Sequence, residues 1–462
     1  MNIDFEKLTE DQMNALEKTM DLFQESKKET DDPIWFRKKR IDEVKFCESF
    51  LKKHPMKCVG GTLYDVDGRV DEAKIENEIF ILVKNYSSSN VARTVTKIID
   101  ALKIASFAQE MPIEENRIFF QNGTYNLKER SFTEKKEFCL NRLPVIYDAN
   151  APEPSHWKNF LEELLYEEDI PALQEFMGYA FIPCNRAQAM LLIIGHGGEG
   201  KSRIALVLRA LLGDNMNMCS IQKLATDRFS RADQEGKLLM VDDDMKTDGL
   251  PDTGILKTLV TLEDKYDLER KGKQSVQGRL YVRIMALGNG TLTALYDKSD
   301  GFYRRQLVIH VKPKQKDRID DRNLIDRLVG EAQGIAQWCL QGLHRLIENN
   351  YEFTISNRMK QNLDEMKKTD NNIYDFLESD GYILFEEHTS ASSKDLYSAY
   401  CRWCGDNLEK PLSEKTFSSQ LKRDQERLGI RYCKNLDIGG GKKARGYTGV
   451  NVQISLAIAA NY

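Results

Sequence analysis

The sequence predicts a multidomain α/β protein with a helical N-terminal region, a core built on a parallel sheet and a C-terminal winged helix. Three observations lead to this fold class. The stretch LLIIGHGGEGKS, residues 191–202, runs from an apolar strand into a glycine-rich turn before a helix. Along most of residues 1–110, apolar residues recur at helical spacing. Residues 370–462 read as three capped helices followed by two strands.

Size and composition suit a globular cytoplasmic protein. At 462 residues the chain has room for two to four domains. No apolar run reaches the length of a membrane span, so we expect no membrane partner, and the acidic start MNIDFEKLTEDQ does not resemble a signal peptide. The nine cysteines lack framework spacing. One CxxC, Cys401 to Cys404, lies in a helical stretch, and we interpret both residues as buried thiols rather than zinc ligands.

Basic residues are concentrated in two places, although the chain as a whole is acidic. The 67 Lys and Arg residues against 72 Asp and Glu give a net charge of −5. Residues 411–450 hold nine basic against four acidic residues, and residues 265–283 hold six against two. Each patch alone is best explained as solvated surface. Together they fit a protein that binds a polyanion at defined places.

The region before the core is expected to form two parts. Residues 1–110 would be a mainly helical domain, with helices within residues 8–26 and 87–108. Residues 111–190 would mix a hairpin with helices leading into the core. The hairpin is predicted from two short runs joined by Asn122-Gly123, a strong turn signal. Helical spacing then covers residues 156–181.

The turn in the core has the phosphate-loop spacing G-x-x-x-x-G-K-S. Its glycines let backbone N–H groups point at one phosphate, beside the N-terminus of the next helix. Lys201 would reach the β- and γ-phosphates of a nucleoside triphosphate, and the Ser202 hydroxyl would bind Mg²⁺. The predicted nucleotide-binding residues are Gly195, His196, Gly197, Gly198, Glu199, Gly200, Lys201 and Ser202.

Two later strands would complete a catalytic site. The strand in residues 236–245 ends in three carboxylates, of which Asp242 and Asp243 are our candidates for holding Mg²⁺ and polarising water, Asp242 being the metal ligand. The register leaves Asp244 open as well. The strand in residues 280–290 ends near Asn289, which would contact the γ-phosphate or its water if this strand lies between the other two.

Two basic features flank these strands. Arg304 and Arg305 precede a further strand, and either one would stabilise transition-state charge from a neighbouring subunit, which predicts an oligomer. Residues 261–280 read as two short strands around Lys271-Gly272-Lys273. Lys271 and Lys273 at such a tip would pair with DNA phosphates without reading sequence.

The C-terminal region, residues 370–462, resembles helix-turn-helix DNA binders of the winged-helix type. Its third helix offers polar and basic side chains, and the glycine-rich loop between its two strands offers more. These candidates are Lys415, Gln420, Lys422, Arg423, Lys442, Lys443 and Arg445. The alternative is a winged helix that binds protein and touches no DNA.

The ordered set of motifs resembles superfamily 3 helicases, in particular the poxvirus and phage–plasmid primase–helicase family. The matching stretches are GHGGEGKS, LLMVDDD, ERKGKQ, IMALGN and DGFYRRQLVIHV, with weaker upstream matches from about residue 115. The resemblance implies an AAA+ ring over residues 191–350, commonly a hexamer, which binds ATP and Mg²⁺ between subunits and translocates on single-stranded DNA. Arg304 or Arg305 would be the finger in trans, and Lys271 or Lys273 would line the pore.

Two departures from that family matter. Relatives often have Glu at the end of the second strand, where this chain has Asp. Many relatives also carry a primase domain, whereas residues 1–110 show no strand with an Asp-x-Asp metal pair. We therefore expect an ATP-hydrolysing helicase of a mobile element, without primer synthesis, acting on single-stranded and forked DNA with other replication proteins. The alternative is an origin-binding initiator that uses ATP as an assembly switch; a small-molecule P-loop kinase fits the flanking regions poorly.

Overall fold

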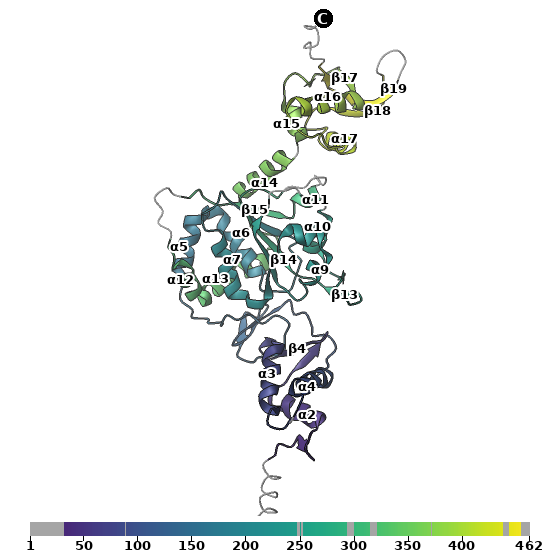
Figure 1. The fold of residues 1–462 in the computed structure, drawn as a ribbon. Coiled ribbons are helices and arrows are strands. Elements are labelled where there is room, and N and C mark those ends of the chain that lie inside the picture. Colours follow the sequence, from purple (N-terminus) through teal and green to yellow (C-terminus); the bar gives the residue numbers. More distant parts are fainter. Residues whose placement is uncertain are drawn as a thin grey trace, which may run out of the picture. The chain divides into compact units, whose positions relative to one another are not determined.

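A computed structural model gives the fold of most of the chain. It describes residues 32–87, 89–246, 250, 253–292, 300–314, 321–370, 372–437 and 443–453. The predicted helix within residues 8–26 and the candidate Lys442 lie outside this set. The chain divides into two compact units, one formed by residues up to 114 with 119–142, the other by 115–118 with residues from 143 onward. Figure 1 follows the chain through both units.

In its described residues, the first unit combines three helices with short antiparallel strands. Asp42 and Asp71 begin the first two helices by accepting hydrogen bonds from Lys45 N and Ala73 N, both at 3.1 Å. The helices are α2 (Glu43–Lys53), α3 (Glu72–Val83) and α4 (Val91–Ala105). The strands are β1 (Phe36–Arg37), β2 (Arg40–Ile41), β3 (Lys57–Val59), β4 (Thr62–Asp65) and β5 (Gly68–Arg69). The predicted helix within residues 87–108 is confirmed as α4, whereas the short strands of this region were not predicted.

Asn122-Gly123 marks a hairpin, as predicted, but for a different reason. The strands are β6 (Arg117–Phe120), β7 (Gly123–Asn126) and β8 (Ser131–Thr133), in that order in one sheet. Gly123 begins β7 rather than occupying the turn. A Cβ there would lie 2.1 Å from Thr133 O and 2.6 Å from the Phe132 ring. The glycine is therefore required by the close approach of β8.

The core of the second unit is a parallel five-stranded sheet with the order β10-β11-β14-β9-β15. Its strands are β9 (Met190–Ile194), β10 (Met216–Met218), β11 (Leu239–Met245), β14 (Arg283–Gly288) and β15 (Gln306–His310). Four of the five were predicted; the short β10 was not. Strands β9 and β14 are buried along their whole length, as continuous apolar runs in a parallel sheet require.

Helices cover both faces of this sheet (Figure 1). One face packs α7 (Ser202–Leu212), α6 (Ile170–Tyr179), α12 (Leu324–Gly330) and α13 (Ala332–Glu348). The other packs α8 (Ile221–Thr226), α9 (Arg228–Ala232) and α10 (Gly254–Thr261). Helices α6 and α13 touch through glycines: a Cβ at Gly178 would lie 2.1 Å from Cys339 O, and one at Gly342 would lie 2.5 Å from Gln174 O. Larger residues at either position would separate the two helices.

Shorter elements connect these layers. Helix α5 (Ser155–Leu164) precedes α6, with a 3₁₀ turn η2 (Glu167–Asp169) between them, and η3 (Gly213–Asn215) follows α7. Helix α11 (Asp300–Tyr303) precedes β15, and α14 (Asn357–Asp370) packs on β15. The expected helical region within residues 156–181 is thereby confirmed.

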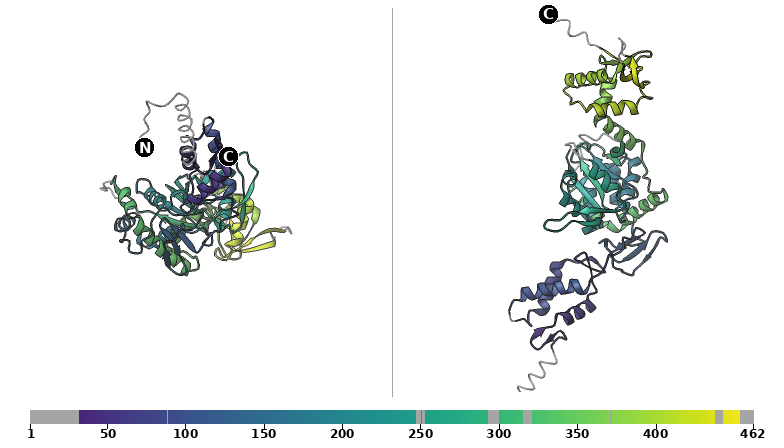
Figure 2. Two further views of the ribbon diagram at one scale, coloured as in Figure 1. Left: turned by 90° about the horizontal axis from the view of Figure 1, so that it is seen from below. Right: turned by 90° about the vertical axis from the view of Figure 1, so that its right-hand side faces the viewer.

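The C-terminal region has its own apolar core. Its helices and strands are drawn in Figure 2 in green to yellow. Its helices are α15 (Asn372–Glu378), α16 (Ser393–Asp406) and α17 (Glu414–Arg423). Its strands are β16 (Ile383–Leu384), β17 (Ser390–Ser392), β18 (Arg431–Asp437), β19 (Lys443–Thr448) and β20 (Asn451–Val452). The rings of Tyr400 and Phe417 stack with centroids 4.9 Å apart, which joins α16 to α17. The three helices and the antiparallel pair β18–β19 were predicted.

Candidate nucleotide pocket and basic hairpin

The glycine-rich turn joins β9 to α7 at the carboxyl edge of the parallel sheet. Gly197, Gly198 and Gly200 have φ of 104°, 80° and 110°, in the region that side chains with a Cβ avoid. Gly195 N donates to Gly288 O of the neighbouring strand β14 at 3.1 Å. The turn is therefore fixed to the sheet, and α7 begins at Ser202, where the motif predicts it.

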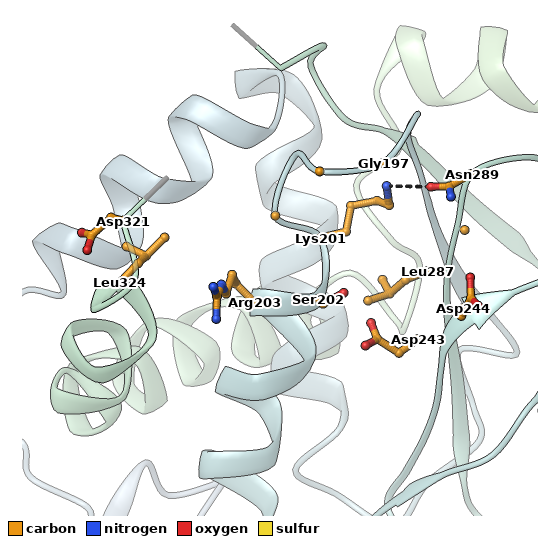
Figure 3. A pocket seen from close by; sticks show the side chains of 13 residues that line it. Gly197, Lys201, Ser202, Arg203, Asp243, Asp244, Leu287, Asn289, Asp321 and Leu324 are labelled. Atoms are coloured by element: carbon orange, nitrogen blue, oxygen red, sulfur yellow. Dashed lines mark hydrogen bonds between the residues drawn. The ribbon is translucent and has the colours of Figure 1, made fainter. Parts of the chain in front are cut away.

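A cavity of about 390 Å³ opens beside this turn (Figure 3). Predicted residues and unpredicted ones line it together. They are Gly197, Gly198, Gly200, Lys201, Ser202, Arg203, Asp243, Asp244, Leu287, Gly288, Asn289, Asp321 and Leu324. The structure thus brings the phosphate loop, the end of β11 and the end of β14 to one pocket. The pocket lies at the carboxyl ends of parallel strands, where ligands bind in open α/β sheets.

The Lys201 ammonium is buried in this pocket and has two oxygen partners. Its Nζ donates to Glu199 Oε2 at 2.9 Å and to Asn289 Oδ1 at 3.3 Å. The Glu199 carboxylate also accepts from the backbone, with His196 N at 2.5 Å and Gly197 N at 3.0 Å. Burial raises the pKa of Glu199, but the hydrogen bonds from Lys201 and from the loop outweigh burial, so its pKa lies below the ordinary value.

Asn289 lies at the predicted place, directly after β14, the strand between β9 and β11. The order β11-β14-β9 puts β14 between the phosphate-loop strand and the carboxylate strand. Both amide atoms of Asn289 lie 3.8 Å from the Cβ position of Gly197. Asn289 therefore faces the turn that would hold the terminal phosphates.

The three carboxylates at the end of β11 do not share one environment. Asp243 and Asp244 line the pocket, whereas Asp242 does not. Asp242 is buried, and its Oδ2 accepts from Ile221 N at the start of α8 at 2.8 Å. Burial raises the pKa of Asp242, partly offset by its backbone hydrogen bonds. This placement disagrees with the choice of Asp242 as metal ligand and catalytic carboxylate, because its carboxylate is held at the start of α8. The register of β11 shifts between Asp242 and Met245, so the regular alternation of side chains is broken there, and Asp243 and Asp244 line the pocket together.

Ser202 and Asp243 are suitable partners for a magnesium ion. Both line the pocket, and in Figure 3 the Asp243 carboxylate lies on the same side of the pocket as Ser202. Hydroxyl and carboxylate oxygens are ligands that Mg²⁺ prefers, together with phosphate oxygens and water. Among the described residues, His, Cys, Asp and Glu nowhere form a group of three or more able to hold a metal. These residues fit an ion held partly by a nucleotide.

Arg203, Asp321 and Leu324 are pocket residues that sequence reasoning missed. Arg203 follows the loop serine directly, and Asp321 and Leu324 lie near the start of α12. In Figure 3 they form the side of the pocket away from Asn289. No spacing rule connects residue 321 with residue 203, since only the packing of α12 on α7 brings them together.

Arg304 and Arg305 lie outside the pocket of their own chain. Arg304 is exposed, and Arg305 is half-buried with its Nη1 donating to Gly301 O. Neither residue lines the cavity. If Arg304 or Arg305 acts on a pocket of this type, that pocket must belong to another copy of the chain. The role of these two arginines in catalysis stays a prediction.

The segment between β11 and β14 forms the predicted hairpin. Strands β12 (Lys265–Leu268) and β13 (Val276–Arg279) pair antiparallel, and Lys271 and Lys273 are exposed at its tip. The Lys271 Nζ lies 5.9 Å from the centroid of the Phe229 ring on α9, and the Arg228 guanidinium lies 5.3 Å from the same ring. The hairpin and α9 thus present cations around an aromatic ring.

A second basic surface lies on the C-terminal region. Lys415, Lys422 and Arg423 are exposed on α17, and Lys443 and Arg445 are exposed on β19. The Lys422 Nζ lies 4.1 Å from the Tyr432 ring of β18, so the end of α17 adjoins the strand pair.

Gln420 does not belong to that exposed set, contrary to the prediction. Its side chain is buried, and its Nε2 donates to Asp424 Oδ2 at 2.8 Å and to the Tyr374 hydroxyl. Gln420 therefore ties α17 to α15 and cannot contact a ligand on the outer face.

Cysteines and helices add two simpler findings. All nine cysteines are free thiols; Cys404 is buried, as predicted, whereas Cys401 is half-buried. Among the described helices, none has the length and apolar content needed to cross a membrane.

Comparison with known proteins gives two family matches. Residues 17–165 match a family described as D5 N terminal like, and residues 193–305 match a family of unknown function, DUF5906. Both matched stretches overlap the region in which the motifs resemble phage–plasmid primase–helicase proteins, and they support that resemblance. None of the curated proteins compared matches the chain.

Three solved structures of one protein region match most of the chain. Two apo structures of the NrS-1 C-terminal region are 13% identical to this chain, with TM-scores of 0.48 and 0.49, covering 87% and 88% of this chain and 98% and 99% of theirs. A third is 14% identical with a TM-score of 0.46, covering 89% of this chain and 99% of its own.

Proposed function

We propose that this protein is an ATP-dependent DNA helicase of superfamily 3 that serves the replication of a mobile element. The observation that carries the proposal is the meeting of the phosphate loop, Asp243 and Asn289 in one pocket, in a domain that also extends a lysine-tipped hairpin. A nucleotide pocket alone is common to many enzymes. The two family matches favour replication over small-molecule phosphoryl transfer.

In this proposal the pocket residues divide phosphate binding, metal binding and activation of water among them. The loop amides and Lys201 bind the phosphates of ATP, and Ser202 and Asp243 hold Mg²⁺, which neutralises charge on the reacting phosphates. Asn289 orients the attacking water, and Asp243 or Asp244 polarises it. Asp242 stabilises the end of β11 by holding α8.

The proposal also includes an oligomer. Arg304 and Arg305 lie outside the pocket of their own chain, so a ring of the AAA+ type, commonly a hexamer, would bring one of them to the neighbour's γ-phosphate. Lys271 and Lys273 would then bind the backbone of single-stranded DNA, with Phe229 beside them available for base stacking.

The test is ATP hydrolysis with and without single-stranded DNA, measured beside strand displacement on a forked duplex. DNA-stimulated hydrolysis together with displacement is the expected result, and Lys201→Ala should abolish both. Full displacement activity in Lys201→Ala would refute the assignment of the site.

A second candidate is an origin-binding initiator in which ATP acts as an assembly switch. The exposed cations of α17 and β19 favour it, since a winged-helix reading of this region places them where duplex DNA binds. It predicts sequence-specific duplex binding that survives Lys201→Ala, and hydrolysis without strand displacement.

A further inference from the structure

The Glu199 carboxylate is hydrogen-bonded to donor groups of the phosphate loop, including the ammonium of Lys201. It accepts hydrogen bonds from His196 N, Gly197 N and Lys201 Nζ, at 2.5, 3.0 and 2.9 Å. These three donors are the groups that a phosphate-binding loop offers to a nucleotide. A Cβ at Gly195 would lie 2.9 Å from both Glu199 Oε1 and Lys201 Nζ, so the ion pair lies directly over the start of the loop.

Burial makes this contact strong. Glu199 is 2% exposed and Lys201 is 8% exposed. A buried ammonium without a counter-charge is costly, and hydrogen bonds that involve an ion are about twice as strong as neutral ones. The pair therefore stabilises the loop in its folded form. While the pair is intact, the atoms that form it cannot contact a ligand.

We propose that Glu199 is an internal competitor of the nucleotide, holding the empty loop in order and lowering its affinity for phosphate. This inference rests on the proposed function, since it describes the regulation of the same site. Entry of a nucleotide requires the carboxylate to leave, and Lys201 and the two amides then change partner from Glu199 to phosphate oxygens. Because the pKa of Glu199 is already lowered, the carboxylate stays charged at neutral pH and must be displaced as an anion.

Glu199→Gln tests the inference with little change of volume. An amide can still accept from one loop N–H, but its NH₂ group donates and so opposes the Lys201 ammonium. The variant should bind a non-hydrolysable ATP analogue more tightly, by on the order of tenfold in Kd, because one set of charge-assisted hydrogen bonds no longer competes. Glu199→Ala should behave in the same way, which covers the case in which Gln misfolds locally.

Thermal unfolding provides a second readout. Without nucleotide, both Glu199 variants should melt below the wild type, because Lys201 loses its buried counter-charge. Saturating nucleotide should then raise their melting temperature more than it raises that of the wild type.

Glu331→Gln is the matched control. Its carboxylate also accepts two backbone N–H groups, from His156 and Trp157 at 3.0 and 2.9 Å, but these groups belong to α5 rather than to the phosphate loop. It should leave nucleotide affinity unchanged. Equal or weaker nucleotide binding by both Glu199 variants would overturn the inference and leave the proposed function intact. A folded wild type and folded variants that all fail to bind the nucleotide would refute the proposed function, and the inference with it.

Discussion

The phosphate loop and the β12–β13 hairpin both offer lysines to a polyanion, but in opposite surroundings. Lys201 is 8% exposed and is held by Glu199 and Asn289. Lys271 and Lys273 are exposed at a turn, and the Lys271 ammonium has an aromatic ring 5.9 Å away. A buried charge acts at one position with little screening, whereas exposed charges act additively and weaken with salt.

This contrast teaches why the two regions would respond differently to mutation. At the loop, geometry matters as much as charge, because the ammonium fits between fixed oxygens. At the hairpin, DNA binding should depend on the lysine charges and little on their exact geometry, because a cation can contact a backbone phosphate from many directions. The following predictions test the contrast in order of decreasing effect.

Substitution by arginine should separate the two regions most clearly. Lys201→Arg keeps the charge but places a larger planar group in a buried site, so ATP hydrolysis should fall by about 10²-fold or more. Lys271→Arg with Lys273→Arg should keep single-stranded DNA affinity within about twofold. Steady-state hydrolysis and fluorescence anisotropy measure the two effects. Near-normal hydrolysis by Lys201→Arg would show that the loop needs charge alone.

Substitutions of two carboxylates of β11 should differ in whether they lower ATP hydrolysis or the stability of the fold. Asp243→Asn should lower hydrolysis by about 10²-fold or more while the protein melts normally, because Asp243 lines the pocket. Asp242→Ala should instead destabilise the fold by about 1–3 kcal/mol, because it leaves Ile221 N buried without its acceptor. Hydrolysis rates and chemical denaturation separate these outcomes; the reverse pattern would restore Asp242 as the catalytic carboxylate.

Removing the hairpin charges should affect DNA more than ATP. Lys271→Ala with Lys273→Ala should weaken single-stranded DNA binding about tenfold and reduce the salt slope of binding by about 1.4, the value for two phosphate contacts. Basal hydrolysis should remain. Lys128→Ala with Lys135→Ala, two exposed lysines beside β7 and β8, is the matched control. Equal losses of DNA binding and basal hydrolysis in the hairpin variant would indicate misfolding.

The smallest expected effect concerns the Glu331 carboxylate, which lies outside both regions. The pKa of Glu331 lies below its ordinary value, because hydrogen bonds from His156 and Trp157 outweigh its burial, which acts in the opposite direction. Glu331→Gln should therefore cost about 1 kcal/mol of stability at pH 7. A lowered pKa stabilises the fold above the ordinary pKa near 4.5, and this contribution is lost as pH falls through the folded value. Denaturation from pH 7 to pH 3 should show the two proteins converging, whereas the exposed Glu76→Gln should match the wild type throughout.

The order of the core elements along the chain could be predicted from the sequence, because each element has a signal within its own residues. Glycine spacing identified the turn between β9 and α7, and uninterrupted apolar runs identified β9, β11 and β14. The reading of two short strands around Lys271-Gly272-Lys273 identified the hairpin. These signals are contained within stretches of a few residues, so a single sequence is enough to read them.

Only the tertiary structure decided which side chains share the pocket. Three adjacent aspartates lie near the end of β11, where the register of the strand shifts, so that Asp242 is held at α8 while Asp243 and Asp244 line the pocket. Asp321 and Leu324 join Arg203 through the packing of α12 on α7, across more than a hundred residues. Glu199 occupies a position that the motif leaves unspecified, and only the fold of the loop places its carboxylate on Lys201. The sequence by itself therefore determined the kind of site, through local backbone and charge patterns, while contacts between distant segments determined its members.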